Sequence, residues 1–376
     1  RSTLFPYTTL FRSAKISKVD IGIQKLKEAV ISGKWDLKDG YISEKQLIEF
    51  LGLSKVSVRR CIAELQSDNY LRSIPYKGYL LGPAAIQKKY DEMRQRGLKK
   101  RIIFVEDMDK ITNFHHKIIL DAAKIEAERF GYDFYTYDLD RGNLFTEVTK
   151  DPSVLTAVAL MKSDLEYIEP LLQCCSPAVM VEYLKEGVSL DSVVQDDRGG
   201  INQAVEYLWN HNHKRIGLAV WGKNYFQPVR RYAAFSAALL RKDIIDPKLV
   251  GTSLRFDAEG GRECVRKLFQ TNDKPTAIII SHLEMAAGVF EELEKMGLTP
   301  GKNVSVVAWG TEVVKQQYLT RTKWENMPLD LIQWSRAEMG KMVVRMIEAR
   351  IIDPGIPPMR VEIPTEIMIK GSVVRI

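Results

Sequence analysis

Residues 43–65 read SEKQLIEFLGLSKVSVRRCIAEL and predict two short helices separated by a tight turn. Ser43, with Gln46 three positions later, forms a capping box that opens the first helix. Gly52 ends this helix, and Ser54 caps the second helix only two residues later. Each helix places its apolar residues on one face. Two amphipathic helices joined this closely are typical of a helix-turn-helix unit.

The flanking segments complete a small domain around this pair. Residues 20–32 carry apolar side chains at helical spacing, so we expect a further helix ahead of the pair. Residues 70–74 and 78–81 alternate in hydrophobicity on either side of a Pro-Tyr-Lys-Gly turn, which predicts a β-hairpin. Residues 14–83 are therefore predicted to form a winged helix-turn-helix domain, with the hairpin as the wing.

The second helix of the pair carries polar and basic residues at its start. A helix of this kind can lay its first turn in a DNA major groove, which is about 12 Å wide. Lys55, Ser57 and Arg59 lie off the apolar face, where they would reach phosphates or base edges. Arg60 lies further round the helix and is expected to contact phosphate. The alternative is a generic three-helix domain, or a helix-turn-helix that mediates protein contacts.

The charge of the chain is divided unevenly. Residues 14–101 hold 19 Lys and Arg against 10 Asp and Glu, whereas the whole chain has a net charge of +7. A basic N-terminal region on a mildly acidic body favours a polyanion such as double-stranded DNA as the partner. A solvated lysine-rich surface would give the same count.

The motifs of the basic region resemble the gluconate-repressor (GntR) family of winged helix-turn-helix domains. The segments GYISEKQL, LGLSKVSVRRCIAEL and YKGY occur in the family's order over about 65 residues. The resemblance implies that the basic residue after the Ser-Glu pair, the start of the recognition helix and the wing contact DNA. At the matching positions stand Lys45, Lys55, Ser57, Arg59 and Gly78, with Lys77 as a neighbour. The family usually has proline where this chain has Ile42.

From residue 101 the sequence alternates between short apolar strands and helices. This order predicts an α/β fold with doubly wound parallel sheets. Residues 101–376 are too long for one such core, so two lobes with a cleft between them are expected. Residues 84–100 are charged, weakly helical and poor in apolar side chains, and we interpret them as a linker. The strands are expected at 102–105, 134–139, 157–161, 178–181, 216–221, 277–280 and 304–309.

The motif survey nominates no catalytic group, cofactor or metal site, so we do not expect an enzyme. No G-x-G-x-x-G segment follows a predicted strand, and neither a P-loop nor a G-x-S-x-G elbow is present. The four cysteines do not have the spacing of metal ligands; they are Cys61, Cys174, Cys175 and Cys264. Cysteines that form no evident disulfide framework are typical of a reducing cytoplasm. No apolar run reaches the ~20 residues of a membrane span. Residues 1–13 lack any structural period, and we interpret them as a non-native leader.

The body resembles the effector domain of the lactose/galactose-repressor (LacI) family, which has the two-lobe fold of periplasmic sugar-binding proteins. The resemblance is carried by VVQDDRGGINQAVEYLWNHNHKRIG at 193–217, by RYAAF at 231–235 and by LTRT at 319–322, in the family's order. It implies a homodimer with a small-molecule effector, commonly a sugar or a derivative, between the lobes. The family's cleft arginine maps onto Arg231, and an acid near a strand end maps onto Asp196, with Glu182 as another candidate.

The chain departs from this family at two acidic positions that bind hydroxyls. The family's Asn-Asp pair is His282-Leu283 here, and Gly310 stands where another aspartate is usual. The effector can therefore be anionic, larger or stacked on aromatic rings, or the pocket can have lost its ligand. Trp221, His282 and Trp309 follow strands, at the end where doubly wound sheets bind ligands.

Together the two resemblances describe a regulator similar to the arabinose-repressor type. The predicted function is that of a DNA-binding transcription regulator, a repressor, whose operator affinity is controlled by a small molecule. The alternative is a ligand-binding or catalytic α/β protein whose N-terminal domain mediates protein contacts.

Overall fold

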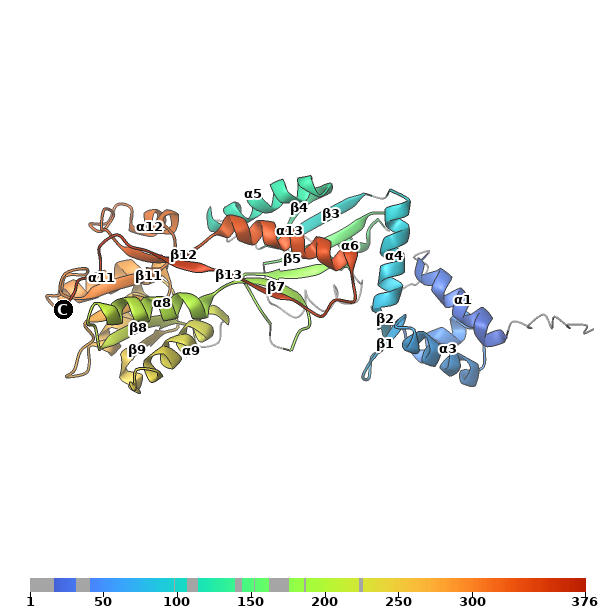
Figure 1. The fold of residues 1–376 in the computed structure, drawn as a ribbon, viewed down its shortest axis with the longest axis horizontal. Helices are drawn as coiled ribbons and strands as arrows, with labels where there is room; N and C mark the ends of the chain where they lie inside the picture. The colour runs from blue at the N-terminus through green and yellow to red at the C-terminus, as the bar shows by residue number, and fades with distance from the viewer. Residues whose placement is uncertain are drawn as a thin grey trace, which may run out of the picture.

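The computed structural model places the N-terminal domain at one end of the chain and two α/β lobes beyond it (Figure 1). It describes residues 17–31, 41–97, 99–106, 114–138, 144–151, 153–161, 176–185, 187–222 and 226–376. The segment 1–13 and the pair Cys174 and Cys175 lie outside the described residues. The α/β fold expected from the sequence is confirmed.

The N-terminal domain packs three helices against a hairpin. Ser43 makes the expected capping box with Gln46, and Gly52 ends the helix in the left-handed conformation at φ 63°. The side chain of Ser54 accepts a hydrogen bond from the Ser57 amide and so begins the next helix. The helices are α1 (Lys18–Ile31), α2 (Glu44–Leu51) and α3 (Lys55–Ser67), and the antiparallel strands are β1 (Leu71–Ile74) and β2 (Gly78–Leu81). This is the winged helix-turn-helix arrangement that the sequence predicts.

Gly78 allows the wing to lie close to the start of α2. Ile42 pairs with Tyr79 as an isolated bridge, so the chain before α2 adds to the hairpin. At φ 126°, a Cβ on Gly78 would lie 2.5 Å from the carbonyl oxygen of Ile42. This close approach requires glycine at position 78. Contact between Gly78 and DNA stays a prediction.

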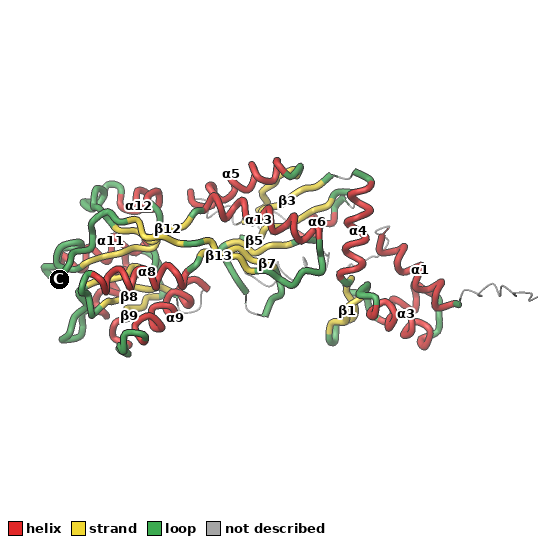
Figure 2. The backbone as a smooth tube through the Cα atoms, viewed as in Figure 1, coloured by secondary structure: helices red, strands yellow, loops and turns green. Residues whose placement is uncertain are grey.

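The segment that joins the N-terminal domain to the body is a helix with buried side chains. Helix α4 (Pro83–Gln95) buries Ala85 in the N-terminal core, and it buries Tyr90 and Met93 in the core of the body. The sequence predicts a charged, weakly helical linker here, and its apolar residues escape that pattern because they are buried by other domains rather than by neighbours in sequence. The helix therefore connects the two cores (Figure 2).

The first lobe is built on a six-stranded parallel sheet with strand order β13-β7-β6-β5-β3-β4. Strands β5, β6 and β7 are buried along their whole length, as expected where a parallel sheet is covered on both faces. Helices α5 and α13 pack side by side on this lobe (Figure 1). Its elements are β3 (Lys100–Glu106), α5 (Phe114–Arg129), β4 (Tyr132–Asp138), α6 (Leu144–Thr149), β5 (Leu155–Leu160), β6 (Ala178–Val181), β7 (Asp191–Gln195), α13 (Arg336–Ile352) and β13 (Arg360–Ile363).

The second lobe has a six-stranded sheet with order β14-β12-β11-β10-β8-β9, in which β14 alone among these strands runs antiparallel to its neighbour. Its elements are α8 (Asp197–Asn210), β8 (Ile216–Trp221), α9 (Phe226–Leu240), β9 (Val250–Ser253), α10 (Ala258–Leu268), β10 (Ala277–Ile280), α11 (Ala286–Lys295), β11 (Ser305–Trp309), α12 (Glu312–Leu319), β12 (Asp330–Trp334) and β14 (Thr365–Met368). Each of the seven strands expected in the body is present, with bounds shifted by one to two residues in four of them.

The chain passes between the lobes at three places. It crosses from β7 into α8, returns from β12 into α13, and crosses again from β13 to β14. These crossings bring residues from distant parts of the sequence to the same space between the sheets (Figure 1). The space between the lobes is therefore the place to look for a ligand.

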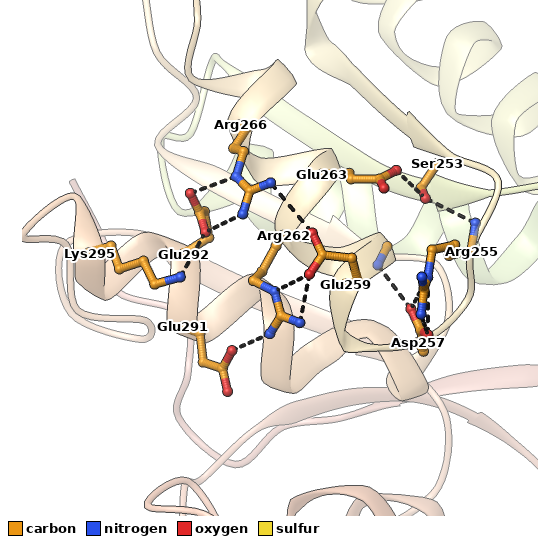
Figure 3. Close-up of polar contacts among 11 residues, drawn as sticks. Ser253, Arg255, Asp257, Glu259, Arg262, Glu263, Arg266, Glu291, Glu292 and Lys295 are labelled. Carbon is orange, nitrogen blue, oxygen red and sulfur yellow. Dashed lines mark hydrogen bonds and ion pairs between the residues drawn. The ribbon is translucent and has the colours of Figure 1, made fainter.

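Helices α10 and α11 of the second lobe pack unusually closely. Figure 3 shows their ion pairs: Arg262 contacts Glu259 of its own helix and Glu291 of α11, and Arg266 contacts Glu292 of α11 at 2.9 Å. The backbones approach where Gly288 of α11 meets the carbonyl of Ala258. A Cβ on Gly288 would lie 1.6 Å from that oxygen, so the packing has no room for a side chain.

We expect Gly288→Ala to lower the free energy of unfolding by about 1–3 kcal/mol, because the methyl group forces the backbones of the two helices apart. The sign is informative, since the same change in an unconstrained helix stabilises by about 1 kcal/mol. Urea unfolding measures the difference. Gly355→Ala is the control, because its methyl group would meet no backbone atom, only the side chains of Asp353 at 3.1 Å and Pro83 at 3.8 Å. Equal effects of the two substitutions would contradict the packing argument.

Candidate functional site

A cavity of about 130 Å³ lies between the two lobes. The cavity is lined by residues at the ends of β6, β7, β11 and β12 and near the starts of α9 and α13, among others. Its lining residues are Glu182, Tyr183, Gln195, Gln227, Arg231, His282, Glu284, Trp309, Gly310, Val314, Trp334 and Arg336. Charged, amide and aromatic groups therefore meet in one small space.

Arg231 of α9 is almost fully buried at one wall of the cavity. Its Nε donates to Asp197 Oδ1 at 2.8 Å, and its Nη1 donates to the carbonyl oxygen of Ser281. The guanidinium lies 3.9 Å from the centroid of the Trp309 ring. Burial raises the pKa of Asp197, while the charge of Arg231 acts in the opposite direction. The pair is thus a buried salt bridge, in which each charge depends on the other.

Arg336, the first residue of α13, forms a similar arrangement at the opposite wall. Its Nη1 donates to Thr311 Oγ1 at 3.2 Å, and its guanidinium lies 4.2 Å from the centroid of the Trp334 ring. The rings of Trp309 and Trp334 are 6.0 Å apart, so the two tryptophans lie between the two arginines. Among the described residues, the buried Nε of Arg336 and the Nε1 atoms of both tryptophans have no hydrogen-bond partner. These atoms are donors available to a bound molecule.

Acceptors face the same cavity. Glu182 adopts a left-handed backbone conformation at φ 63°, and its carboxylate lies 3.3 Å from His116 Nε2. Burial raises the pKa of Glu284, although Arg231 and Arg336 oppose this shift. The buried Oε1 of Gln195 makes no hydrogen bond within the described part of the chain. Burial lowers the pKa of His282 well below its ordinary value, and the charge of Arg231 lowers it further, so His282 is neutral near pH 7.

The structure brings together four of the six effector-binding residues expected from the sequence. Arg231, Glu182, His282 and Trp309 line the cavity. Gly310 also lines it, whereas Leu283 is fully buried beneath the cavity and offers no polar group.

Two of the expected residues have other roles. The side chain of Asp196 caps α8 by accepting from the Gly199 amide at 2.8 Å, and the next residue, Asp197, holds Arg231 instead. Trp221 packs edge-on against His282 and also against Phe256, outside the cavity lining. Both differences have the same cause. The end of a strand determines which part of the fold a residue lies in, but it does not determine the direction of the side chain.

Sequence reasoning missed several lining residues, chiefly Arg336, Trp334 and Glu284. Trp334 and Arg336 flank the second crossing between the lobes, which no local motif marks. Glu284 stands one position after Leu283, the residue that aligns with the aspartate of the LacI family, so the alignment does not mark it. A strand-end tryptophan followed by a capping serine, as in Trp334-Ser335, was the available signal.

The basic residues that the sequence assigns to DNA binding are exposed in the N-terminal domain. Lys45, Lys55, Arg59 and Arg60 are exposed near the start of α2 and along α3. Lys77 is exposed at the tip of the wing, with its Nζ 5.2 Å from the centroid of the Tyr41 ring. The Ser57 hydroxyl lies 3.0 Å from the hydroxyl of Ser54, so part of its hydrogen-bonding capacity is used within the helix cap. Whether these residues contact DNA stays a prediction.

Comparison with known proteins assigns the fold of the body. Residues 205–373 match the family model described as a periplasmic binding protein-like domain. This region has the fold of a periplasmic-binding-protein-like domain. The CelR–cellobiose complex, a solved transcriptional regulator, has a TM-score of 0.60 at 18% identity, covering 88% of this chain and 99% of that one. CcpA of Lactococcus lactis, another transcription regulator, has a TM-score of 0.60 at 16% identity and covers 73% of this chain and 99% of that one.

Similar sequences also occur among transcription regulators. The HTH-type transcriptional regulator GalR of Lacticaseibacillus casei is 23% identical over 276 residues, which are 71% of this chain and 79% of that protein. The HTH-type transcriptional repressor PurR of Histophilus somni strain 129Pt is 24% identical over 198 residues, or 52% of this chain. The match to PurR spans 57% of that repressor, a little more than half its length. No helix among the described residues has both the length and the apolar character that a bilayer crossing requires.

Proposed function

We propose that the chain is a DNA-binding transcription regulator of the LacI type, a repressor, in which a GntR-type winged helix-turn-helix binds operator DNA. A small effector binds between the lobes and changes operator affinity. The protein acts in the cytoplasm as a homodimer. The observation that carries this proposal is the joining of an exposed basic recognition helix to a periplasmic-binding-protein-like domain.

The geometry of the N-terminal domain supports operator binding. Helix α3 begins with exposed Lys55, and Arg59 follows one turn later on the exposed side. The wing places Lys77 at its tip, where it can contact the phosphate backbone beside the groove. The β-hairpin and the Ile42–Tyr79 bridge support the GntR-type assignment of this domain, because they form a wing packed against the helices.

The chemistry of the cavity supports an uncharged effector with several hydroxyl groups, a sugar or a sugar derivative. Hydroxyl groups both donate and accept, and the cavity offers unpaired donors on Arg336 and Trp334 beside an unpaired acceptor on Gln195. The two carboxyl groups of Glu182 and Glu284 offset the guanidinium groups of Arg231 and Arg336, so this lining has no excess of positive charge to hold a phosphate or a carboxylate. The similar CelR structure is a complex with the sugar cellobiose. A sugar phosphate fits this charge pattern less well.

An exposed sheet edge supports the homodimer. Strand β4 is the last strand of the first-lobe sheet and carries exposed Tyr135. Ile125 is 61% exposed and Phe130 36% exposed, on the neighbouring helix α5 and just after it. A second copy would cover these apolar groups and place two N-terminal domains on two half-sites, about one helical turn or a multiple of it apart.

The test is a fluorescence-anisotropy titration of the full chain with genomic DNA fragments at several salt concentrations, with and without a panel of free sugars. The proposal expects affinity that falls steeply with salt and that changes about 5–150-fold with one sugar. Thermal-shift screening against sugars and sugar phosphates identifies the effector class. An α/β ligand-binding protein whose N-terminal domain contacts proteins would show no salt-dependent DNA affinity, and that result would remove the proposal.

Arg59→Ala is expected to weaken binding to the operator by about 1–3 kcal/mol if Arg59 reads a base. Competition titrations with operator and with unrelated duplexes measure the loss. A loss confined to the operator supports base readout, whereas an equal loss on all duplexes reassigns Arg59 to a phosphate contact. Lys88→Ala is the control, because it removes an exposed positive charge from α4 instead of α3.

A further inference from the structure

An acidic residue lies within the basic surface of the N-terminal domain. Glu44, the first residue of α2, receives the Nε–H of Arg59 with both carboxylate oxygens at 3.1 Å. Its Oε1 also lies 3.7 Å from Lys55 Nζ. Glu44 therefore joins the start of α2 to the first two turns of α3, which is the part of α3 that would enter the groove.

General attraction to DNA does not account for an acid at this place, and folding accounts for it only in part, through the favourable interaction of Glu44 with the dipole of α2. The side chains of Glu44 and Arg59 are 28% and 62% exposed, and ion pairs as exposed as this contribute little to stability. A carboxylate among the basic residues also repels the phosphate backbone, so it lowers the affinity for DNA of any sequence. The position of Glu44 needs a role that outweighs this cost.

The ion pair restricts the direction of Arg59. Because the Nε–H is shared by both carboxylate oxygens, the pair favours one orientation of the guanidinium and leaves Nη1 and Nη2 to bind DNA. Neither Nη group makes another hydrogen bond within the described residues. Two parallel N–H donors match O6 and N7 of guanine in the major groove, and this bidentate contact requires a defined orientation of the guanidinium. A phosphate contact would not require it.

We propose that Glu44 is a positioning residue, which holds Arg59 in the orientation that reads a guanine of the operator. Glu44 thereby lowers the affinity for unspecific DNA and raises the preference for the operator. This inference rests on the proposed DNA-binding function and adds a specificity-determining residue to it.

The test compares Glu44→Gln with Glu49→Gln, which removes the same charge from an exposed position of the same helix. The probes are a duplex selected by the full wild-type chain from a randomised pool and a shuffled duplex of the same composition. For Glu44→Gln we expect affinity for the selected duplex to fall about tenfold while affinity for the shuffled duplex rises. Loss of folding lowers both affinities, so it cannot produce changes of opposite sign. Glu49→Gln should leave the affinity for the selected duplex unchanged.

A double-mutant cycle tests whether Glu44 acts through Arg59. If it does, adding Glu44→Gln to Arg59→Ala causes no further loss of affinity for the selected duplex, and selections with either single variant relax the same guanine position. The proposal is overturned if the two substitutions cause additive losses of affinity for the selected duplex. It is also overturned if Glu44→Gln changes the affinities for the selected and the shuffled duplex in the same direction. Absence of binding by the wild-type chain to both duplexes would instead defeat the DNA-binding function itself.

Discussion

Asp197→Ala is expected to lower the free energy of unfolding by about 3–5 kcal/mol, because it leaves the charge of Arg231 buried without its partner. The side chain of Asp197 is fully buried, and that of Arg231 is 2% exposed. Asp197 also lies 3.5 Å from Arg230 Nε, so the substitution affects two arginines of α9. Urea unfolding followed by circular dichroism measures the loss. Arg231 would also lose its fixed position in the cavity, so sugar-induced thermal shifts should disappear.

The preceding residue provides a matched control. Asp196 has the same carboxylate, but it caps α8 from a less buried position, and its replacement by alanine should cost about 1 kcal/mol. If Asp197→Ala costs no more than Asp196→Ala, the buried pair has no special role. The double variant Asp197→Ala/Arg231→Met removes both charges and should recover part of the stability lost in Asp197→Ala.

The contrast between these two aspartates shows how far the sequence defines the candidate site. The strand before them is predictable, since a buried parallel strand leaves an apolar run and its end places the next residues near the cleft. The direction of each side chain depends on local geometry. Asp196 faces the free amides of α8, and Asp197, one residue later, faces α9. The local pattern therefore identified the turn of the chain, but it could not tell which of the two carboxylates would hold Arg231.

The residues contributed by the crossings were harder to predict. Arg336 and Trp334 enter the cavity only because the chain returns from the second lobe to the first between β12 and α13. No motif in the sequence gives the spacing between two lobes. The wing and the two capped helices were predictable in detail, because capping boxes, left-handed glycines and hairpin turns depend on residues that are close in sequence.

The burial of helix α4 was also hard to predict from the sequence, for a related reason. Tyr90 and Met93 are three positions apart and share a face of the helix, but the charged residues around them hide this short apolar stripe. Their burial depends on the body, which begins several residues later. Ile86 contacts the cores on both sides of the junction. We therefore expect α4, which is fixed at both ends, to transmit movement of the first lobe to the N-terminal domain.

Tyr90→Ala is therefore expected to detach α4 from the body while each domain stays folded. Truncation of a buried aromatic side chain lowers stability by about 3–5 kcal/mol. Here the truncated side chain belongs to the contact between α4 and the first lobe, so that contact is weakened. Cleavage by glutamyl endopeptidase at Glu92 should accelerate at least about tenfold, because this cost favours the open form. Operator affinity should persist, but it should no longer respond to the effector sugar.

The control for this prediction is Lys88→Ala, which changes an exposed position of the same helix and should alter neither the cleavage rate nor the response. Tyr90→Phe keeps the buried ring and should preserve the coupling, which separates packing from the hydroxyl group. A Tyr90→Ala protein that is cleaved faster yet keeps its full response to the sugar would show that the signal bypasses α4. Coupling would then have to pass through contacts between two copies of the chain or through the pocket that Arg72 and Leu81 of the hairpin line together with residues 354–358 of the first lobe.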